Sequence, residues 1–272
     1  MKSSRPSITA RAIAIVASSA VLFACAPRAA ETRVATLQVV CSGGFFAALQ
    51  ELAPQFEQSS GTRLMIGRGP SMGQTQNAIP LRLQRGERID VVIMAGSALD
   101  GLVQDGKVVA SSRVDLARSA IGVVVRKGAP RPDIRSAEAV KRALLDAASI
   151  AYSDSASGVY ISTEMFQRLG IADQVKAKAR MIPAEPVAGI VARGEAEIGF
   201  QQMSELLPVP GVDLVGPLPP ELQKITPFSA GMVVGSSAPD AASAFIRFLS
   251  SPAAVTAIAR SGLMPIASAP VN

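Results

Sequence analysis

The stretch Ile150–Tyr160, with the sequence IAYSDSASGVY, holds the residue types in this chain that most clearly could bind a ligand. Its first three residues are apolar and predict a buried strand, and the serines and Gly158 that follow predict a turn into a helix. The first N–H groups of a helix have no partner inside the helix, and the macrodipole makes that end positive. This junction could therefore bind an anion, or it could be an ordinary N-cap, since Ser and Asp are the usual capping residues.

The same order of strand, small polar loop and helix start occurs at three other places in the chain. It follows the predicted strands at residues 37–41, 63–67 and 178–182. Four such junctions favour anion binding over capping alone, because helix starts at the carboxyl ends of strands are where open α/β sheets bind ligands. The junction residues predicted to contact a ligand are Ser42, Gly43, Arg68, Ser71, Met72, Ser155, Ser157 and Gly158.

Three side chains at these junctions could exchange a proton with a bound ligand, and each has a simpler alternative. Asp154 could instead cap its turn, Tyr160 could pack in the core, and Glu185 could only complement a helix dipole. The sequence contains no His, which excludes Ser/His/Asp catalysis. A general base in this protein would therefore be a carboxylate, a Tyr, a Lys or a bound water, and we predict it among these three residues.

The elements that position these residues alternate between strand and helix along the chain, which predicts an α/β protein with mainly parallel sheets. Two extended segments, residues 119–126 and 226–235, are interpreted as crossings between two lobes, and the Pro/Gly-rich stretch 207–220 as a surface loop. We predict lobe 1 from residues 36–116 and 229–272, and lobe 2 from residues 117–228. The ligand is expected in the cleft between the lobes.

Composition excludes several classes of function. The net charge of +6 is spread along the chain without a basic, aromatic-rich tract, so we expect no nucleic-acid partner. Without His, and with Cys41 as the one internal cysteine, no zinc site and no disulfide framework are expected. No phosphate loop or hydride-acceptor motif is present, and we expect no cofactor and a monomer. Cys41 itself is interpreted as a small buried hydrophobe.

The N-terminus, residues 1–26, is predicted to be an export signal. Lys2, Arg5 and Arg11 precede an apolar run from Ala12 to Ala24 that is too short for a membrane span. Cleavage by signal peptidase after Ala26 and lipidation of Cys25 are both compatible with the residues at its end. The mature protein is therefore expected in the periplasm, either soluble or held to the membrane by a lipid.

Six segments of the chain, taken in order, resemble the type 2 periplasmic binding proteins, and within them the molybdate-binding family. The resemblance covers residues 37–266 and implies two lobes with an interlobe ligand cleft. The matching segments are VVCSGGFFAALQELAPQFE, GRGPSMGQTQNAI, RGERIDVVIMAG, YSDSASGVY, VARGEAEIGF and AASAFIRFLSSPAAVTAIARSGLMP.

The resemblance implies an oxyanion site built from serine hydroxyls and backbone N–H groups, without charged side chains. Ser42 and Ser71 stand where the family's serines fall, and Ser157 and Val187 stand near the backbone donors of the second lobe. The chain departs from that pattern by placing Arg68 directly before the second serine loop, Gln201-Gln202 where a Tyr is common, and Tyr152, Asp154 and Tyr160 at the third junction. Arg presents a planar fork that pairs with carboxylates, although Arg68 could also be a solvated charge at the rim. A pocket with Arg, Gln and Tyr suits an organic polycarboxylate better than a compact tetrahedral anion.

Two functions from different classes follow from this resemblance. The segments CSGGF, GPSMG and YSDSASGVY look most like the aconitate isomerase branch, which implies interconversion of trans- and cis-aconitate. That reaction needs a base beside a substrate carboxylate and stabilisation of a dienolate, with Asp154, Tyr160 or Glu185 as the base. The alternative is a receptor that delivers molybdate or another anion to an ABC permease, because a fold does not choose between the two.

Overall fold

The computed structural model describes residues 35–266 together with Met1. The predicted export signal and Cys25 therefore lie outside the described residues. The described chain forms two sheets, in the strand orders β11-β4-β10-β3-β1-β2 and β7-β6-β8-β5-β9. Helices cover both sheets, which confirms the predicted α/β class with two lobes.

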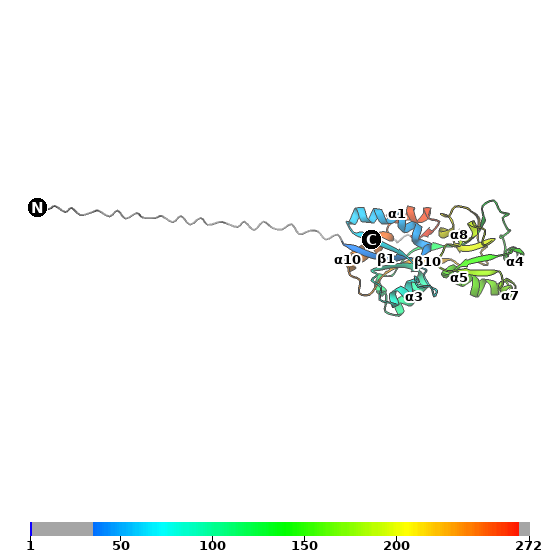
Figure 1. The fold of residues 1–272 in the computed structure, drawn as a ribbon, viewed down its shortest axis with the longest axis horizontal. Helices are drawn as coiled ribbons and strands as arrows, with labels where there is room; N and C mark the ends of the chain where they lie inside the picture. The colour runs from blue at the N-terminus through cyan, green and yellow to red at the C-terminus, as the bar shows by residue number, and fades with distance from the viewer. Residues whose placement is uncertain (2–34, 267–272) are drawn as a thin grey trace. The chain divides into compact units, whose positions relative to one another are not determined.

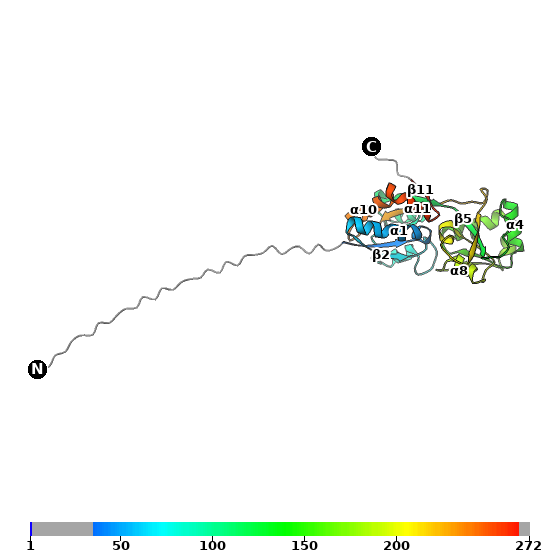
Figure 2. The same ribbon diagram turned by 90° about the horizontal axis from the view of Figure 1, so that it is seen from above.

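The sheet of lobe 1 is buried on both faces because its central strands are apolar throughout. All five residues of β3 are buried, and successive side chains of β1 and β3 enter two separate hydrophobic clusters. Helices α1, α10 and α11 cover one face, and α2 and α3 cover the other. Figure 1 shows α1 and α3 on opposite sides of the strands, and Figure 2 shows α1 beside α10 and α11. The elements are β1 (Thr36–Cys41), α1 (Gly43–Ser60), β2 (Arg63–Arg68), α2 (Ile79–Gln84), β3 (Val91–Ala95), α3 (Gly96–Gln104), η1 (Ala110–Ser112), β4 (Val114–Ser119), β10 (Thr226–Met232), α10 (Pro239–Leu249), η3 (Pro252–Ala254), α11 (Val255–Arg260) and β11 (Met264–Pro265).

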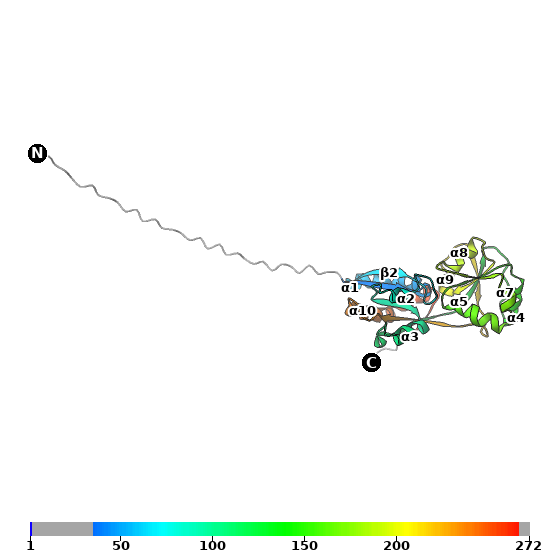
Figure 3. The same cartoon turned by 60° about the horizontal axis from the view of Figure 1, so that its bottom comes forward.

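The sheet of lobe 2 is covered in the same way. Helices α4, α5 and α7 pack on one face, while α8 and α9 pack on the other, and Figure 3 shows α8 and α5 on opposite sides of the strands. The helix that begins with α5 continues through a π-helical turn, η2, into α6. The elements are β5 (Ile121–Arg126), α4 (Ala137–Asp146), β6 (Ile150–Ser153), α5 (Ala156–Tyr160), η2 (Ile161–Met165), α6 (Phe166–Arg168), α7 (Ala172–Val175), β7 (Ala179–Ile182), α8 (Val187–Ala192), β8 (Ile198–Gln202), α9 (Met203–Leu206) and β9 (Val212–Pro217).

The sheets are mixed, and the prediction of mainly parallel sheets was wrong. Strand β1 pairs in parallel with β2 and β3, as β6 does with β7 and β8. Strand β10 is antiparallel to β3 and β4, and β5 is antiparallel to β8 and β9. The antiparallel strands are those next to the passages between lobes. There the chain enters from the other sheet, so no crossover helix sets a parallel direction.

Three segments differ from their predicted form. The predicted strand 119–126 is broken at Ala120, so that β4 and β5 belong to different sheets. The predicted loop 207–220 contains strand β9, which completes the edge of the lobe 2 sheet beside β5. The chain therefore passes from one sheet to the other at Ala120 and again between β9 and β10. The predicted lobe limits were 116/117 and 228/229. The helix expected after the small polar loop that follows the strand 63–67 begins only at Ile79, after a longer irregular loop.

Helix α10 and the segment 252–260 both contribute to the hydrophobic cluster around α1. Phe245 of α10 packs against Phe56 of α1, with the rings tilted by 54° and their centroids 4.9 Å apart. Within residues 35–266, no single helix is long and apolar enough to cross a membrane. Helix α10 and the segment 252–260 pass this test of length and apolarity only as a pair, and the pair is bent by 59°.

Candidate active site

The carboxyl ends of β1, β2, β6 and β8 meet at a cavity of about 200 Å³. Residues of both lobes line it, as expected for a ligand site at the ends of α/β strands. This volume is below the ~300–1,000 Å³ of sites for drug-sized molecules, so the cavity suits a small ligand. The lining residues are Gly43, Arg68, Gly69, Pro70, Asn77, Ser153, Asp154, Ser155, Ala184, Glu185, Pro186, Gln201 and Glu205.

Polar contacts join the two lobes around this cavity. The backbone N–H of Ser71 donates to the hydroxyl of Ser155 at 3.2 Å. The hydroxyl of Thr75 lies 3.4 Å from Oδ2 of Asp154. On the other side, the hydroxyl of Ser204 donates to the carbonyl oxygen of Gly44 at 2.7 Å. The loops from β2 and β6 therefore touch directly, and the lobes are closed over the cavity.

Ser42 stands at the N-cap position of α1 but does not cap the helix. Its hydroxyl is buried, and Oγ has no hydrogen-bond partner among the described residues. The next two backbone N–H groups, of Gly43 and Gly44, likewise donate to no atom of the described chain. Buried polar groups are nearly always hydrogen-bonded, so this group of donors at a helix N-terminus points to a missing acceptor.

The residues of the predicted third junction divide into two groups. Asp154 and Ser155 line the cavity. Ser157 and Gly158 do not line it but build the turn: the Ser157 and Ser153 hydroxyls lie 3.0 Å apart, and the Gly158 N–H donates to the Ser153 hydroxyl at 3.3 Å. A Cβ on Gly158 would lie 1.6 Å from the carbonyl oxygen of Ser153, so only glycine allows this close approach.

Arg68, Gln201 and Glu205 form a polar group inside the cavity. Nη2 of Arg68 lies 3.4 Å from Oε1 of Glu205, and the Arg68 guanidinium also lies over the ring of Phe46. Gln201 donates from Nε2 to the same Oε1 at 2.9 Å and accepts the backbone N–H of Val187 at 2.9 Å. Gln201 therefore fixes the Glu205 carboxylate and the start of α8 together.

Glu205 is a nearly buried carboxylate, with its side chain 9% exposed. Burial raises its pKa to about 7, against an opposing effect of the Arg68 charge and of the hydrogen bonds from Arg68 and Gln201. A carboxyl group with this pKa exists in both protonation states near neutral pH. This is the property that proton-transferring side chains require.

Asp154 and Glu185 lie at the cavity but are already engaged with other groups. Oδ2 of Asp154 accepts the backbone N–H of Ala184 at 3.0 Å, which holds that residue in the left-handed region at φ 57°. Glu185 forms an ion pair with Arg193 at 2.7 Å, and its side chain is 43% exposed. These contacts indicate that Asp154 shapes the loop after β7, and that Glu185 stands at the rim.

Tyr160 and Met72, two predicted site residues, lie away from this cavity and line a separate hollow near β5. Tyr160 is buried in the core of lobe 2, and its hydroxyl donates to the carbonyl oxygen of Leu222 at 2.7 Å. The hydroxyl also accepts a hydrogen bond from Arg168. The structure therefore does not bring Tyr160 to the cavity between the lobes, because the ring is turned into the core of lobe 2.

Glu205 is the charged cavity residue that the sequence patterns did not predict. It lies in α9, the short helix that follows β8, four residues after Gln201 and close to the carboxyl end of a fully buried strand. A carboxylate at such a position was the available signal, since ligands bind at the carboxyl ends of these strands. The predicted site residues end at Gln201, so none of them lies in α9.

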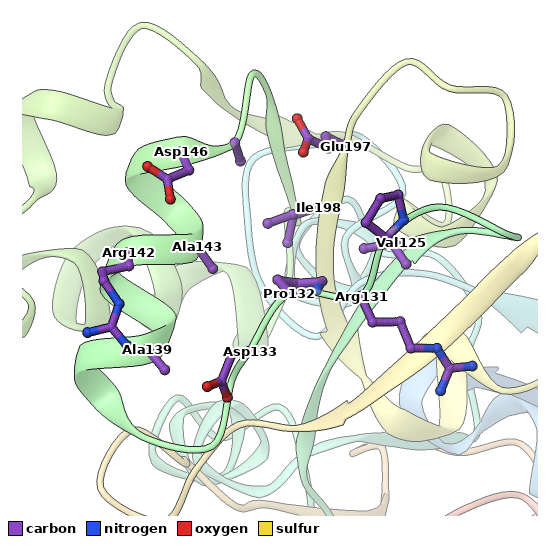
Figure 4. Close-up of a pocket in the computed structure, with 12 residues that line it drawn as sticks. Val125, Arg131, Pro132, Asp133, Ala139, Arg142, Ala143, Asp146, Glu197 and Ile198 are labelled. Atoms are coloured by element: carbon purple, nitrogen blue, oxygen red, sulfur yellow. The ribbon is translucent and has the colours of Figure 1, made fainter.

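A second hollow, of about 350 Å³, opens at the opposite end of the lobe 2 sheet, at the amino ends of β6 and β8 (Figure 4). Charged side chains of both signs surround it in Figure 4, among them Arg131, Asp133 and Glu197. Asp133 already pairs with Arg135 at 2.9 Å. The mixture of exposed charges and the position away from the strand carboxyl ends make this hollow a weaker candidate.

A metal site is not formed by the described chain: residues 35–266 contain no group of three His, Cys, Asp or Glu side chains arranged to hold an ion. Cys41 is fully buried, and burial raises the pKa of its thiol above the usual range. The thiol donates to the carbonyl oxygen of Ser42 at 3.2 Å. Cys41 is thus packed as a small apolar residue, as predicted, and not placed as a nucleophile.

Residues 37–264 match the family model described as bacterial extracellular solute-binding protein. The chain belongs to this family. Among curated proteins, this solute-binding protein is 51% identical to an aconitate isomerase from Pseudomonas sp., over 94% of this chain and 97% of the relative. It is 28% identical to a molybdate-binding protein from Azotobacter vinelandii, over 71% of this chain and 72% of the relative.

The solved structures place this solute-binding protein in the predicted fold. The periplasmic molybdate-binding protein of Azotobacter vinelandii superposes with a TM-score of 0.66 at 22% identity, over 84% of this chain and 98% of that one. The predicted resemblance to type 2 periplasmic binding proteins is confirmed. The sequence is nevertheless more similar to the isomerase than to the molybdate-binding protein.

Proposed function

We propose that this protein is a periplasmic aconitate isomerase that interconverts trans- and cis-aconitate by allylic proton transfer without a cofactor. The observation that carries the proposal is the 51% identity to an aconitate isomerase, which extends over 94% of the chain. The cleft chemistry supports it, because a cationic fork and a nearly buried carboxylate stand within one small cavity. A small organic acid is the proposed ligand, and Cys25, outside the described residues, is the proposed lipid-anchor position if the signal is of the lipoprotein type.

The cavity offers separate places for binding and for chemistry. Arg68 is the proposed partner of a substrate carboxylate, since its fork pairs with planar carboxylates and 43% of its side chain is exposed. The hydroxyl of Ser42 and the free N–H groups at the start of α1 are the proposed donors to a second carboxylate. Ser155 and the backbone of the loop after β7 close the other side. These donors stabilise charge that develops on the carboxylates when a proton is removed.

Molybdate transport is the competing function, and Glu205 counts against it. A compact dianion in this cavity would lie against a carboxylate that is nearly buried and 3.4 Å from the one cation lining the cavity among the described residues. Like charges at short range are costly where water is excluded. A polycarboxylate can reach Arg68 with one group and leave room at Glu205 for a carbon atom.

The first expected result is isomerisation by the purified wild-type protein. Incubation with trans-aconitate should produce cis-aconitate, followed by proton NMR, and addition of a strong chelator should leave the rate unchanged. Ammonium molybdate serves as the competing ligand in a parallel calorimetric titration. Binding of molybdate without binding or turnover of trans-aconitate would identify a receptor and reject the isomerase.

The second expected result concerns Arg68. Arg68→Ala should weaken trans-aconitate binding by about 1.5–3 kcal/mol, the usual contribution of a hydrogen bond to a charged group, or roughly 10- to 150-fold in Kd. Arg63→Ala, at the exposed opposite end of the same strand, is the matched control for loss of one positive charge. Calorimetry on both variants measures the difference. Equal affinities for the two variants would remove Arg68 from the binding site.

A further inference from the structure

We infer that Glu205 is the catalytic acid/base that carries the proton between the two allylic carbons of the substrate. The inference rests on the proposed isomerase function and assigns its central chemical role to a residue outside the three that the sequence suggested. It depends on the position of the carboxylate, on its hydrogen bonds, and on the engagement of the other acidic groups in the cavity.

The two oxygens of the Glu205 carboxylate have different surroundings. Oε1 is held by Nε2 of Gln201 at 2.9 Å and by Nη2 of Arg68 at 3.4 Å. Oε2 has no hydrogen-bond partner among the described residues. The fully buried side-chain atoms that lack a partner are Ser42 Oγ and Gln202 Oε1, so Oε2 of Glu205 is not fully buried. Because Glu205 lines the cavity, this second oxygen is open to the cavity and free to accept a proton. One oxygen is thus positioned by the protein and the other is left for the substrate.

The carboxylate also lies against the start of α1, where the donors for a substrate carboxylate are found. A Cβ on Gly43 would lie 1.9 Å from Oε1 of Glu205 and 2.8 Å from Nη2 of Arg68. Glu205 therefore occupies space that only a glycine at position 43 leaves open. A carbon atom next to a carboxylate bound by Arg68 or by α1 would be within reach of this side chain.

The other acidic groups of the cavity are less suited to the role. Oδ2 of Asp154 accepts the backbone N–H of Ala184 within lobe 2, and it also lies 3.4 Å from the hydroxyl of Thr75 in lobe 1. Glu185 is paired with Arg193, and its side chain is 43% exposed, so solvent water has access to the carboxylate. Tyr160 is outside the cavity. Glu205 alone among these combines burial, an open oxygen and a neighbouring cation.

The proton transfer balances without a further reactant. Oε2 of Glu205 removes a proton from the methylene carbon of trans-aconitate, and the electrons of the broken C–H bond enter the conjugated system as a dienolate. Arg68 and the N–H groups of α1 stabilise the charge that spreads onto the carboxylate oxygens. The protonated Glu205 then returns the proton to the former vinyl carbon. The double bond now joins the central carbon to the former methylene carbon, and Glu205 is again a carboxylate.

The pKa of about 7 is consistent with this role, because the group must both take up and release a proton in each cycle. The base is active in its deprotonated form, so kcat/KM should rise as pH increases through about 7 and level off above it. Gln201 is the positioning residue for this carboxylate. Its amide also holds the start of α8, which links the acid/base to the loop that closes the cavity.

The test is Glu205→Gln, with turnover of trans-aconitate, binding by calorimetry and deuterium uptake from D2O followed by NMR. Turnover and deuterium exchange should fall by about 10²–10⁴, the usual contribution of a general acid/base, while Kd changes by only a few-fold. Glu138→Gln, on the exposed first turn of α4, is the control for the same chemical change at the surface and should behave like wild type. Glu205→Asp, which keeps a carboxylate, should retain measurable exchange with a shifted pH profile.

The outcomes separate this inference from the proposed function. If wild type isomerises trans-aconitate and Glu205→Gln keeps more than about a tenth of the turnover, Glu205 is not the acid/base, although the protein is an isomerase. If wild type neither isomerises nor exchanges the substrate, the proposed function fails instead, and with it the role of Glu205. Should Glu205→Gln fail to fold, the pH profile and the exchange of Glu205→Asp decide, and a profile identical to wild type would reject the assignment.

Discussion

Gly43→Ala should lower kcat by about 10²-fold or more and leave the protein folded. The added Cβ would lie 1.9 Å from Oε1 of Glu205 and 2.8 Å from Nη2 of Arg68, so both side chains would have to move. Each of these atoms is the far end of a flexible side chain, and the displacement therefore costs the fold little. Displacement of reacting groups by about 1 Å is enough to cost 10²-fold in rate. Steady-state kinetics with trans-aconitate, beside a thermal melt, measure the two effects separately.

Gly101→Ala is the matched control for this change. Gly101 lies inside α3, no atom stands within 4 Å of the Cβ it would gain, and its backbone is helical. Alanine favours a helix interior over glycine by up to about 1 kcal/mol, so this variant should be slightly stabilised and fully active. If Gly43→Ala has the kcat of wild type, Glu205 does not lie against α1 as described. If Gly43→Ala fails to fold while Gly101→Ala folds, the contact between Gly43 and Glu205 is needed for the fold.

Glu205→Gln should be more stable than wild type at pH 8 and equally stable near pH 4.5. The folded-state pKa of Glu205 is about 7, above the ordinary value of 4.5, so the folded protein binds the proton more tightly than the unfolded chain. The contribution of Glu205 to stability is therefore complete below pH 4.5 and is lost as pH rises through about 7. The corresponding difference is about 3 kcal/mol at pH 8, or roughly 6–12 °C in Tm for a domain of this size.

Thermal melts of wild type and Glu205→Gln across this pH range measure the effect. Carboxylates elsewhere titrate in both proteins, so their contributions cancel in the difference. Glu138→Gln controls for the loss of one surface carboxylate. A Tm difference that stays constant between pH 5 and pH 8 would show that Glu205 is not held in a desolvated state. The predicted result pairs a gain in stability with a loss of activity, as expected where function requires a strained group.

Local sequence patterns determined the class of fold and the general position of the ligand. Apolar runs followed by Ser/Gly loops predict strand-to-helix junctions because the strand is buried on both faces and the helix start needs donors for capping or binding. The structure has such junctions at Ser42 and Ser155, and both lie at the cavity or directly beside it. The resemblance of ordered segments to solute-binding proteins likewise depended on residues that are close in the sequence.

These local patterns could not predict which strands pair with each other. The direction of β10 and the presence of β9 depend on which strand each one meets, and an isolated segment carries no record of its neighbour. A Tyr at the position of Tyr160 could belong to a core or to a ligand site, because the sequence pattern is the same in both cases. The packing of its helix decides between them and turns the ring toward Leu222. The chemical role of a Tyr depends on that orientation.

Glu205 shows most clearly what the tertiary structure decided. In the sequence it is one carboxylate among many, on a four-residue helix that periodicity cannot predict. Folding places it beside Arg68, 137 residues away, and against Gly43 of the other lobe. Its pKa rises because both lobes exclude water from it, and desolvation is a property of the closed cavity and not of any local segment. The residues that could bind an anion were visible in the sequence, whereas the carboxylate that could move a proton was selected by burial.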